Sequence, residues 1–127
     1  MKIIYVNDKN ANIFEKEAKH NKAFVKYFSP TCPACIAMEN EWDGLCSDIE
    51  NKYNTDLILA QMDPTGMESL GSRDIHTDVD YVPSLLLLEN GKKTKEYNGS
   101  RNKDSMIEFL LEEGLIKSKT GGSKNKY

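Results

Sequence analysis

The sequence predicts an α/β domain in which a central mixed β-sheet of about five strands is flanked by helices on both faces. Three observations lead to this prediction. Strand-like and helix-like segments alternate along much of the 127-residue chain. Two of the strand-like runs are apolar enough to be covered on both faces, and an Asn90-Gly91 pair late in the chain indicates a β-hairpin. Helix-linked strands combined with a hairpin make a mixed sheet.

The first half of the chain contains two predicted strands and two predicted helices. Residues 2–6 form a short strand, and residues 11–20 carry a weak helical pattern. Residues 23–28 are nearly all apolar or aromatic, which is typical of a central strand, and Pro30 ends it. From Cys32 onward the apolar residues recur at steps of three and four, so they share one helical face: Cys35, Met38, Trp42, Leu45 and Ile49.

The second half begins with another buried strand and ends with a helix. Residues 56–62 are densely apolar. The segments that follow are a turn at 63–66, a short helix at 67–70, a polar loop at 71–80, hairpin arms at 85–88 and 93–98, and a helix capped by Asn102 and stopped by Gly114. Residues 117–127 have no apolar period and predict a flexible basic tail, so the expected domain spans residues 1–116.

The motif with the clearest chemical meaning is Cys32-Pro33-Ala34-Cys35. The strand before it, followed by a Ser-Pro-Thr turn, would deliver Cys32 to the N-terminal end of a helix. There the unpaired N–H groups and the helix dipole favour a thiolate. Cys35 lies about one turn further along, close enough to form a disulfide with Cys32 and to open it again. A Cys-x-x-Cys pair in a chain with three cysteines is catalytic or metal-binding rather than part of a disulfide framework.

The residues around this motif resemble the thioredoxin fold, and within it the catalytic domain of protein disulfide isomerases. Residues 28–35 are similar to the isomerase pattern of aromatic, small residue, Pro, Trp, Cys, Gly, His, Cys. Further matching stretches are Glu41-Trp42, Leu59-Ala60-Gln61-Met62-Asp63, Val82-Pro83-Ser84 and Tyr97-Asn98-Gly99-Ser100-Arg101. The resemblance covers about residues 2–116, and it implies the thioredoxin fold for nearly the whole chain.

Some residues of the motif depart from the isomerase pattern. Thr31 replaces the tryptophan that usually precedes the first cysteine. The active-site dipeptide Pro33-Ala34 replaces Gly-His, so no histidine is present to stabilise the Cys32 thiolate. Asn40 stands where a helix-kinking proline is common in the family.

Lys26 is the departure with the largest chemical consequence. It stands where the family has a buried acid, and Gln61 stands where the family has the lysine partner of that acid. If Lys26 points under the cysteine pair, its charge would stabilise thiolates and make the disulfide a stronger oxidant. Alternatively, burial lowers the Lys26 pKa and the neutral amine takes a proton from Cys35. In a third interpretation the side chain snorkels to the surface and does neither.

The resemblance also implies roles for the residues of the site. Cys32 would be the nucleophile that attacks a substrate disulfide, and Cys35 would resolve the mixed disulfide that results. Pro83, as the cis-proline of the family, would lie beside the pair. Together with Val82 and Thr31 it would form the groove in which an extended substrate pairs.

The remaining candidate residues carry weaker expectations. Arg101 resembles a family arginine that helps the second cysteine to ionise, and its alternative is a solvated loop charge. Cys46 lies 11 residues after Cys35 on the same predicted helix, roughly 16 Å away, so we expect a packed thiol and no disulfide between them. The spacing of His20 and His76 does not support a zinc site with the cysteine pair, and no metal or cofactor is predicted.

These features predict a thiol–disulfide oxidoreductase that acts on protein disulfides through a reversible Cys32–Cys35 disulfide. Its partners would be protein thiol or disulfide substrates and an unidentified electron donor or acceptor. Reduction, oxidation and isomerisation would use the same two cysteines. The alternatives are a glutaredoxin-like oxidoreductase, a thioredoxin-fold binding module with little turnover, and a metal or iron–sulfur cluster shared by two copies through Cys32.

Composition limits the partners and the location. The net charge of −3 and the 29% of charged residues argue against a nucleic-acid-binding surface. No apolar run approaches the ~20 residues that a membrane span needs. The apolar start of the chain is too short for a signal peptide, so we expect a cytoplasmic location. We also expect a monomer. Packaging in the particle of a large DNA virus is the alternative location.

Overall fold

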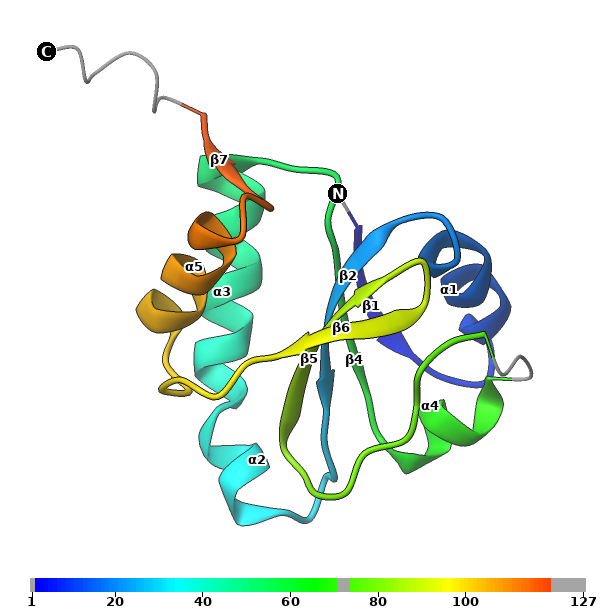
Figure 1. Ribbon diagram of the computed structural model, residues 1–127. Coiled ribbons are helices and arrows are strands. Elements are labelled where there is room, and N and C mark those ends of the chain that lie inside the picture. Colours follow the sequence, from blue (N-terminus) through cyan, green and yellow to red (C-terminus); the bar gives the residue numbers. More distant parts are fainter. Residues whose placement is uncertain (1, 71–73, 120–127) are drawn as a thin grey trace, which may run out of the picture.

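The computed structural model describes residues 2–70 and 74–119 and confirms a five-stranded mixed sheet between two layers of helices (Figure 1). The strands lie in the order β1 (Lys2–Val6), β4 (Ile58–Met62), β2 (Lys22–Tyr27), β5 (Ser84–Glu89) and β6 (Lys92–Glu96). Strands β1 and β2 run parallel to β4, whereas β5 is antiparallel to both β2 and β6. The two strands that the sequence predicts to be buried, β2 and β4, are therefore inner strands.

Two helices cover each face of the sheet. Helices α1 (Ala11–Ala18) and α4 (Pro64–Ser69) lie on one side, and α3 (Glu39–Lys52) and α5 (Lys103–Glu112) lie on the other (Figure 1). Within the described ranges, none of the helices has the length and apolar character needed to cross a membrane.

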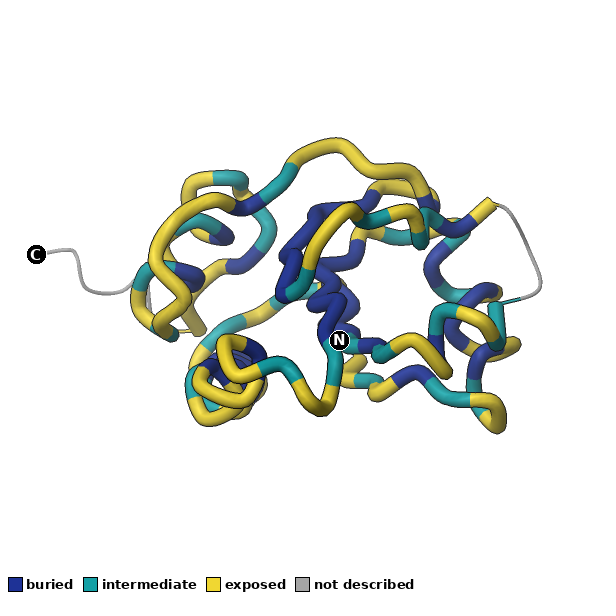
Figure 2. Tube along the Cα trace, turned by 90° about the horizontal axis from the view of Figure 1, so that it is seen from below, coloured by how far each residue is buried: buried dark blue, intermediate teal, exposed yellow. Residues whose placement is uncertain are grey.

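Alternation along the strands divides the buried side chains into two cores. In β2, Phe24 packs on the side of α3 and α5, whereas Val25 and Tyr27 pack on the side of α1. Figure 2 shows the buried positions gathered along the sheet, with exposed positions on the outer helices. The same alternation places Lys26 on the Phe24 side, where a charged residue has to share an apolar core.

The predicted turn and cap residues are confirmed. Asn90 and Gly91 have φ angles of 53° and 85° and form the tight turn between β5 and β6. The Asn102 side chain accepts a hydrogen bond of 2.8 Å from the Ser105 N–H and so caps α5. Gly114 follows the end of this helix with a φ of 73°.

The single helix predicted from Cys32 to Ile49 is wrong, because the chain breaks at Met38. Helix α2 (Pro33–Ala37) ends there and α3 begins. The Met38 N–H donates to the Cys35 carbonyl at 3.2 Å, the tighter spacing of a 3₁₀ turn, and the Met38 carbonyl accepts from the Trp42 N–H at 2.9 Å. Apolar spacing did not reveal the break because Met38 and Trp42 remain buried on either side of it.

The segment predicted as a turn at residues 63–66 is instead the start of α4. The Asp63 carboxylate accepts a hydrogen bond of 3.0 Å from the Gly66 N–H, and Pro64 occupies the first helical position. Both features are typical of a helix N-terminus.

The first residues of the predicted tail belong to the fold. Residues Lys117–Ser118 form β7, which pairs antiparallel with β3 (Tyr53–Asn54) in a second, two-stranded sheet. The ordered domain therefore extends beyond the expected boundary at residue 116. The rest of the predicted tail, residues 120–127, lies outside the described residues.

The described part of the loop between α4 and β5 is held by the end of β2 and by the β5–β6 turn. Ile75 is buried in the core on the α1 side. The His76 N–H donates to the Gly91 carbonyl at 2.8 Å, and the His76 carbonyl accepts from the Tyr27 hydroxyl at 2.7 Å. These bonds anchor the segment that leads into Val82 and Pro83. Residues 71–73 of the predicted loop lie outside the described residues.

Candidate dithiol site

Cys32 and Cys35 meet at the start of α2, just beyond the C-terminal end of β2. Cys32 is the N-cap residue, with extended φ and ψ of −80° and 119°. Its Sγ accepts a hydrogen bond of 3.2 Å from the Cys35 N–H. Pro33 takes the first helical position, where no backbone N–H is needed. Cys32 is half-buried, whereas Cys35 is only 1% exposed, so Cys32 is the thiol that a substrate can reach.

The two thiols differ in acidity because of their surroundings. The hydrogen bond from the Cys35 side chain lowers the pKa of Cys32, and the N–H groups of Cys35 and Ala34 add to this effect. Burial raises the pKa of Cys35, and its hydrogen bond to Cys32 raises it further. Cys32 is therefore the nucleophile favoured by the structure, and Cys35 needs help to ionise.

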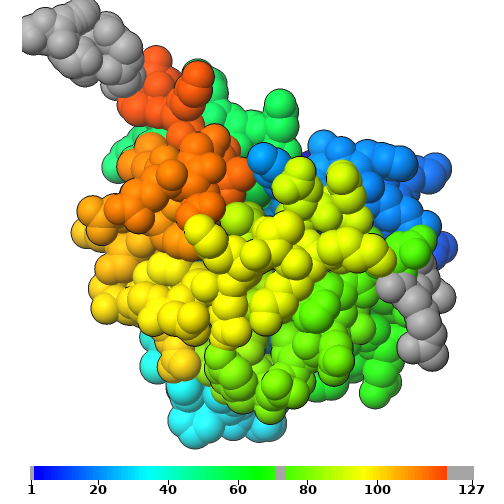
Figure 3. Space-filling model, viewed as in Figure 1, coloured from blue at the N-terminus to red at the C-terminus, as the bar shows by residue number. Residues whose placement is uncertain are grey.

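The Val82–Pro83 segment lies beside the cysteine pair, although it is about fifty residues away along the chain. The peptide bond between Val82 and Pro83 is cis, and Pro83 is buried. The Cys32 Sγ lies 3.9 Å from the Val82 carbonyl oxygen. Figure 3 shows the cyan α2 region at one end of the molecule, next to the yellow-green segment that precedes β5. Thr31 is exposed at the same end.

Lys26 is buried in the core and does not snorkel to the surface, so that interpretation is wrong. Only 1% of the residue is exposed. Its Nζ lies 4.8 Å from the ring centroid of Phe28 and 5.4 Å from that of Trp42. Burial lowers the pKa of Lys26, while the negative charge of Asp43 opposes this effect.

Arg101 and Cys46 stand in contrasting surroundings. Arg101 is exposed, and its charge helps to lower the pKa of Cys32. The role at Cys35 that the resemblance implies stays a prediction. Cys46 is 7% exposed, and burial raises its pKa to about 12, which confirms the expected packed thiol. It lies on α3, whereas Cys35 lies on α2.

The structure adds two apolar side chains that the sequence did not single out. Tyr81 and Ile36 are 52% and 50% exposed. Tyr81 directly precedes Val82, and its hydroxyl donates to the Glu96 carboxylate. Ile36 directly follows Cys35. Their positions next to Val82 and Cys35 were the available signal, but exposure cannot be read from periodicity in such short segments.

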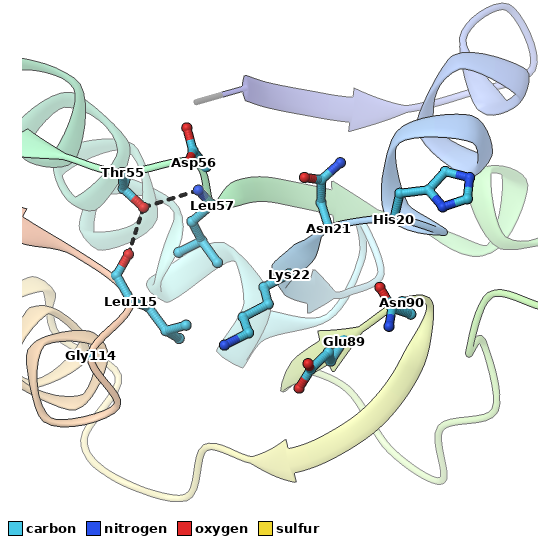
Figure 4. Close-up of a pocket in the computed structure, with 10 residues that line it drawn as sticks. All are labelled: His20, Asn21, Lys22, Thr55, Asp56, Leu57, Glu89, Asn90, Gly114 and Leu115. Carbon is cyan, nitrogen blue, oxygen red and sulfur yellow. Dashed lines mark hydrogen bonds between the residues drawn. The ribbon is translucent and has the colours of Figure 1, made fainter.

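A cavity of about 360 Å³ lies at the opposite end of the sheet. It is bordered by the start of β2, the residues before β4 and the β5–β6 turn (Figure 4). The His20 ring points away from Lys22 and Leu115 in this view. No group of three or more His, Cys, Asp and Glu side chains suited to a metal ion occurs within residues 2–70 and 74–119. Because it lies at the opposite end of β2, the cavity is separate from the cysteine pair.

The fold and the cysteine pair together define a thiol–disulfide oxidoreductase domain. A reachable thiol of lowered pKa stands at a helix N-terminus, and a second, buried thiol stands within reach of it. The Thioredoxin family model matches residues 2–112. The chain belongs to the thioredoxin family.

The curated proteins similar to this chain include a protein disulfide-isomerase and a thioredoxin domain-containing protein. The chain is 29% identical over 101 residues to a protein disulfide-isomerase of Datisca glomerata, covering 79% of this chain and 20% of that protein. It is 27% identical over 97 residues to the thioredoxin domain-containing protein 5 homolog of Drosophila melanogaster, covering 76% and 23%. The chain therefore spans about a fifth of the length of these relatives.

Solved structures show the same fold. The J-Trx1 fragment of ERdj5 matches with a TM-score of 0.65 at 21% identity, over 87% of this chain and 51% of that one. The first two thioredoxin domains of Naumovozyma dairenensis Eps1p match with a TM-score of 0.61 at 23% identity, over 77% and 36%. At these identities the likeness concerns the fold alone.

Proposed function

We propose that this protein exchanges disulfides with protein substrates and that its activities include isomerisation. The observation that carries the proposal is the pairing of the two thiols. Cys32 is reachable and has a lowered pKa, and Cys35 is buried directly behind it. The similarity to protein disulfide-isomerases supports the protein substrate class.

The chemistry begins at the Cys32 thiolate. It attacks one sulfur of a substrate disulfide, forming a bond between Cys32 and that sulfur while the other substrate sulfur leaves as a thiolate. Cys35 then loses its proton and attacks the Cys32 Sγ. The Cys32–Cys35 disulfide forms, the substrate is released with both thiols reduced, and two electrons have passed from the protein to the substrate. The reverse sequence oxidises a substrate.

Isomerisation uses the same first step without net electron transfer. A second thiol of the substrate attacks the mixed disulfide before Cys35 does, which forms a different substrate disulfide and regenerates the Cys32 thiolate. Net reduction of substrates would instead require an external electron donor to restore the dithiol.

The surface around Cys32 suits an extended polypeptide. The Val82 carbonyl beside the Cys32 Sγ offers a hydrogen-bond acceptor to a substrate backbone, as in strand addition. Exposed Tyr81 and Ile36, next to the two halves of the site, offer apolar contact area on either side. A protein segment that has lost its native fold provides both kinds of group.

The test uses three single variants and two assays, reduction of insulin and reactivation of scrambled ribonuclease. Cys35→Ser should accumulate a mixed disulfide with the substrate that survives acid trapping, and Cys32→Ser should form none. Cys46→Ser is the matched control and should behave as the unmodified protein. If Cys32→Ser retains full activity, the proposal fails. Turnover that depends on glutathione alone would favour the glutaredoxin-like alternative.

A further inference from the structure

A lysine occupies a core position between the rings of Phe28 and Trp42, where its charge acts on Cys35. The alternation of β2 directs Lys26 to the same face as Phe24, toward α3. Lys26 is 1% exposed, and it is the one buried lysine among the residues that the structure describes. A charged ammonium group in such a place is unfavourable unless its surroundings compensate.

The compensation does not come from a contact ion pair. Within residues 2–70 and 74–119, no carboxylate oxygen lies within 4.0 Å of the Lys26 Nζ. The ammonium group instead faces two aromatic rings, those of Phe28 at 4.8 Å and Trp42 at 5.4 Å. These rings hold a positive charge in place but leave it without a close counter-ion.

The two rings place this charge next to the active-site segment. Phe28 begins the loop that leads to Cys32, and Trp42 lies in the first turns of α3. The titratable groups that act on Lys26 are two exposed carboxylates and two buried thiols: Asp43, Glu39, Cys35 and Cys46. Of these, Cys35 is the one that must become an anion during the reaction.

We propose that Lys26 is the internal counter-charge of the Cys35 thiolate and sets the rate at which Cys35 resolves mixed disulfides. Both groups are almost fully buried, so their charges interact with little screening by water. The inference rests on the proposed function, because it needs a mixed disulfide at Cys32. Lys26 acts through Cys35 and touches no substrate atom.

The step can be written with all charges in place. Cys35 releases its proton to water while Lys26 keeps its own, so a thiolate stands opposite an ammonium group. The thiolate attacks the Cys32 Sγ, the Cys32–Cys35 bond forms, and the bond to the substrate sulfur breaks. The substrate leaves as a thiolate and takes up a proton from water. The protein is oxidised by two electrons, and the substrate is reduced.

Single-turnover kinetics test the inference. The unmodified protein is reacted at Cys32 with 5,5′-dithiobis(2-nitrobenzoate), and the release of the second thionitrobenzoate, which reports attack by Cys35, is followed against pH. In Lys26→Met the half-maximal pH should rise by about one unit, so release at neutral pH slows about tenfold. Lys22→Met, on the same strand but exposed, is the matched control and should release at the unmodified rate.

The outcomes separate the inference from the function on which it rests. If the unmodified protein releases no second thionitrobenzoate, the proposed function fails. If it does, and Lys26→Met shows the same pH profile, the inference is overturned. Lys26→Arg, which keeps the charge, should restore at least part of the lost rate, and a variant that stays as slow as Lys26→Met also counts against a role of charge.

A second measurement needs no variant. The Lys26 side chain is followed by nuclear magnetic resonance through pH titrations of the reduced and the oxidised protein. Because oxidation removes the Cys35 thiolate, Lys26 should titrate at a lower pH in the oxidised form. Identical titration curves for the two forms would contradict the proposed coupling.

Discussion

At the scale of single residues, Cys32 and Cys35 have the same side chain but different tasks. The N-cap position gives Cys32 several hydrogen-bond donors that favour its thiolate. Cys35 loses water contact on the inner side of the same short helix, which disfavours its thiolate. Local geometry alone therefore separates the attacking thiol from the resolving one.

This difference predicts the order of alkylation in the reduced protein. Because its pKa is lowered, Cys32 should react with iodoacetamide at a lower pH than Cys35 or Cys46, as measured by peptide mass spectrometry. In Cys35→Ala the strongest stabilising hydrogen bond is lost, and the half-maximal pH for Cys32 should move up. Equal reaction of all three cysteines at every pH would be incompatible with these surroundings.

The burial of Lys26 predicts that its replacement has opposite effects on stability and activity. Burial lowers its pKa in the folded state, so the charged side chain destabilises the fold fully below that pKa. The penalty declines as the pH rises through the folded pKa and is gone above the ordinary lysine value of 10.5. Lys26→Met should therefore be more stable at neutral pH, by about 1 kcal/mol, although it resolves mixed disulfides more slowly.

Urea denaturation at several pH values measures this effect. The stability difference between Lys26→Met and the unmodified protein should shrink toward high pH, whereas Lys22→Met should show no such trend. A Lys26→Met variant that is less stable at neutral pH would mean that the aromatic contacts of Lys26 outweigh its desolvation.

At the scale of elements, the β5–β6 hairpin supports the site from a distance. Gly91 has a φ of 85°, and its carbonyl accepts the hydrogen bond from His76. A Cβ on Gly91 would lie 2.3 Å from the Asp74 carbonyl oxygen. The hairpin turn and the loop that leads to Val82 therefore pack too closely for any other residue.

Two glycine variants separate backbone strain from this close approach. Gly114 has a φ of 73° but open space around it, so Gly114→Ala should lose only about 1 kcal/mol from the unfavourable φ. Gly91→Ala carries the same strain and a backbone clash, and it should lose clearly more, at least about 2 kcal/mol. Thermal or urea unfolding gives both values. Equal losses would show that the loop moves aside without penalty.

At the scale of the whole molecule, the sheet brings distant segments to one end. Strands β2 and β5 are antiparallel, and Tyr27 near the end of β2 pairs with Ser84 at the start of β5. Cys32 and Pro83 lie just beyond these positions, so the sheet register itself places the cysteine pair beside the Val82–Pro83 segment. The resemblance to protein disulfide isomerase domains implied that Pro83 lies beside the cysteine pair, whereas the strand order and register that bring it there were not predicted from the sequence.

Other features were not readable from the sequence, for physical reasons. The break at Met38 leaves the apolar spacing unchanged, so periodicity cannot detect it. Lys26 stands at a buried position of β2 but has a polar, charged side chain, so the sequence left open whether that side chain is buried or snorkels to the surface. The pairing of β7 with β3 joins two short polar segments far apart in the chain, which carry no local signal.

The reduction potential of the Cys32–Cys35 pair tests the central claim most directly. The protein is equilibrated in glutathione redox buffers, and the dithiol fraction is read by thiol trapping and by fluorescence of Trp42, the single tryptophan, which is buried near Lys26. We predict one intramolecular disulfide with a potential less negative than the about −270 mV of thioredoxin, because the lowered Cys32 pKa and the charge of Lys26 favour the reduced form. A protein that forms no disulfide between Cys32 and Cys35 in any of these buffers would contradict the account.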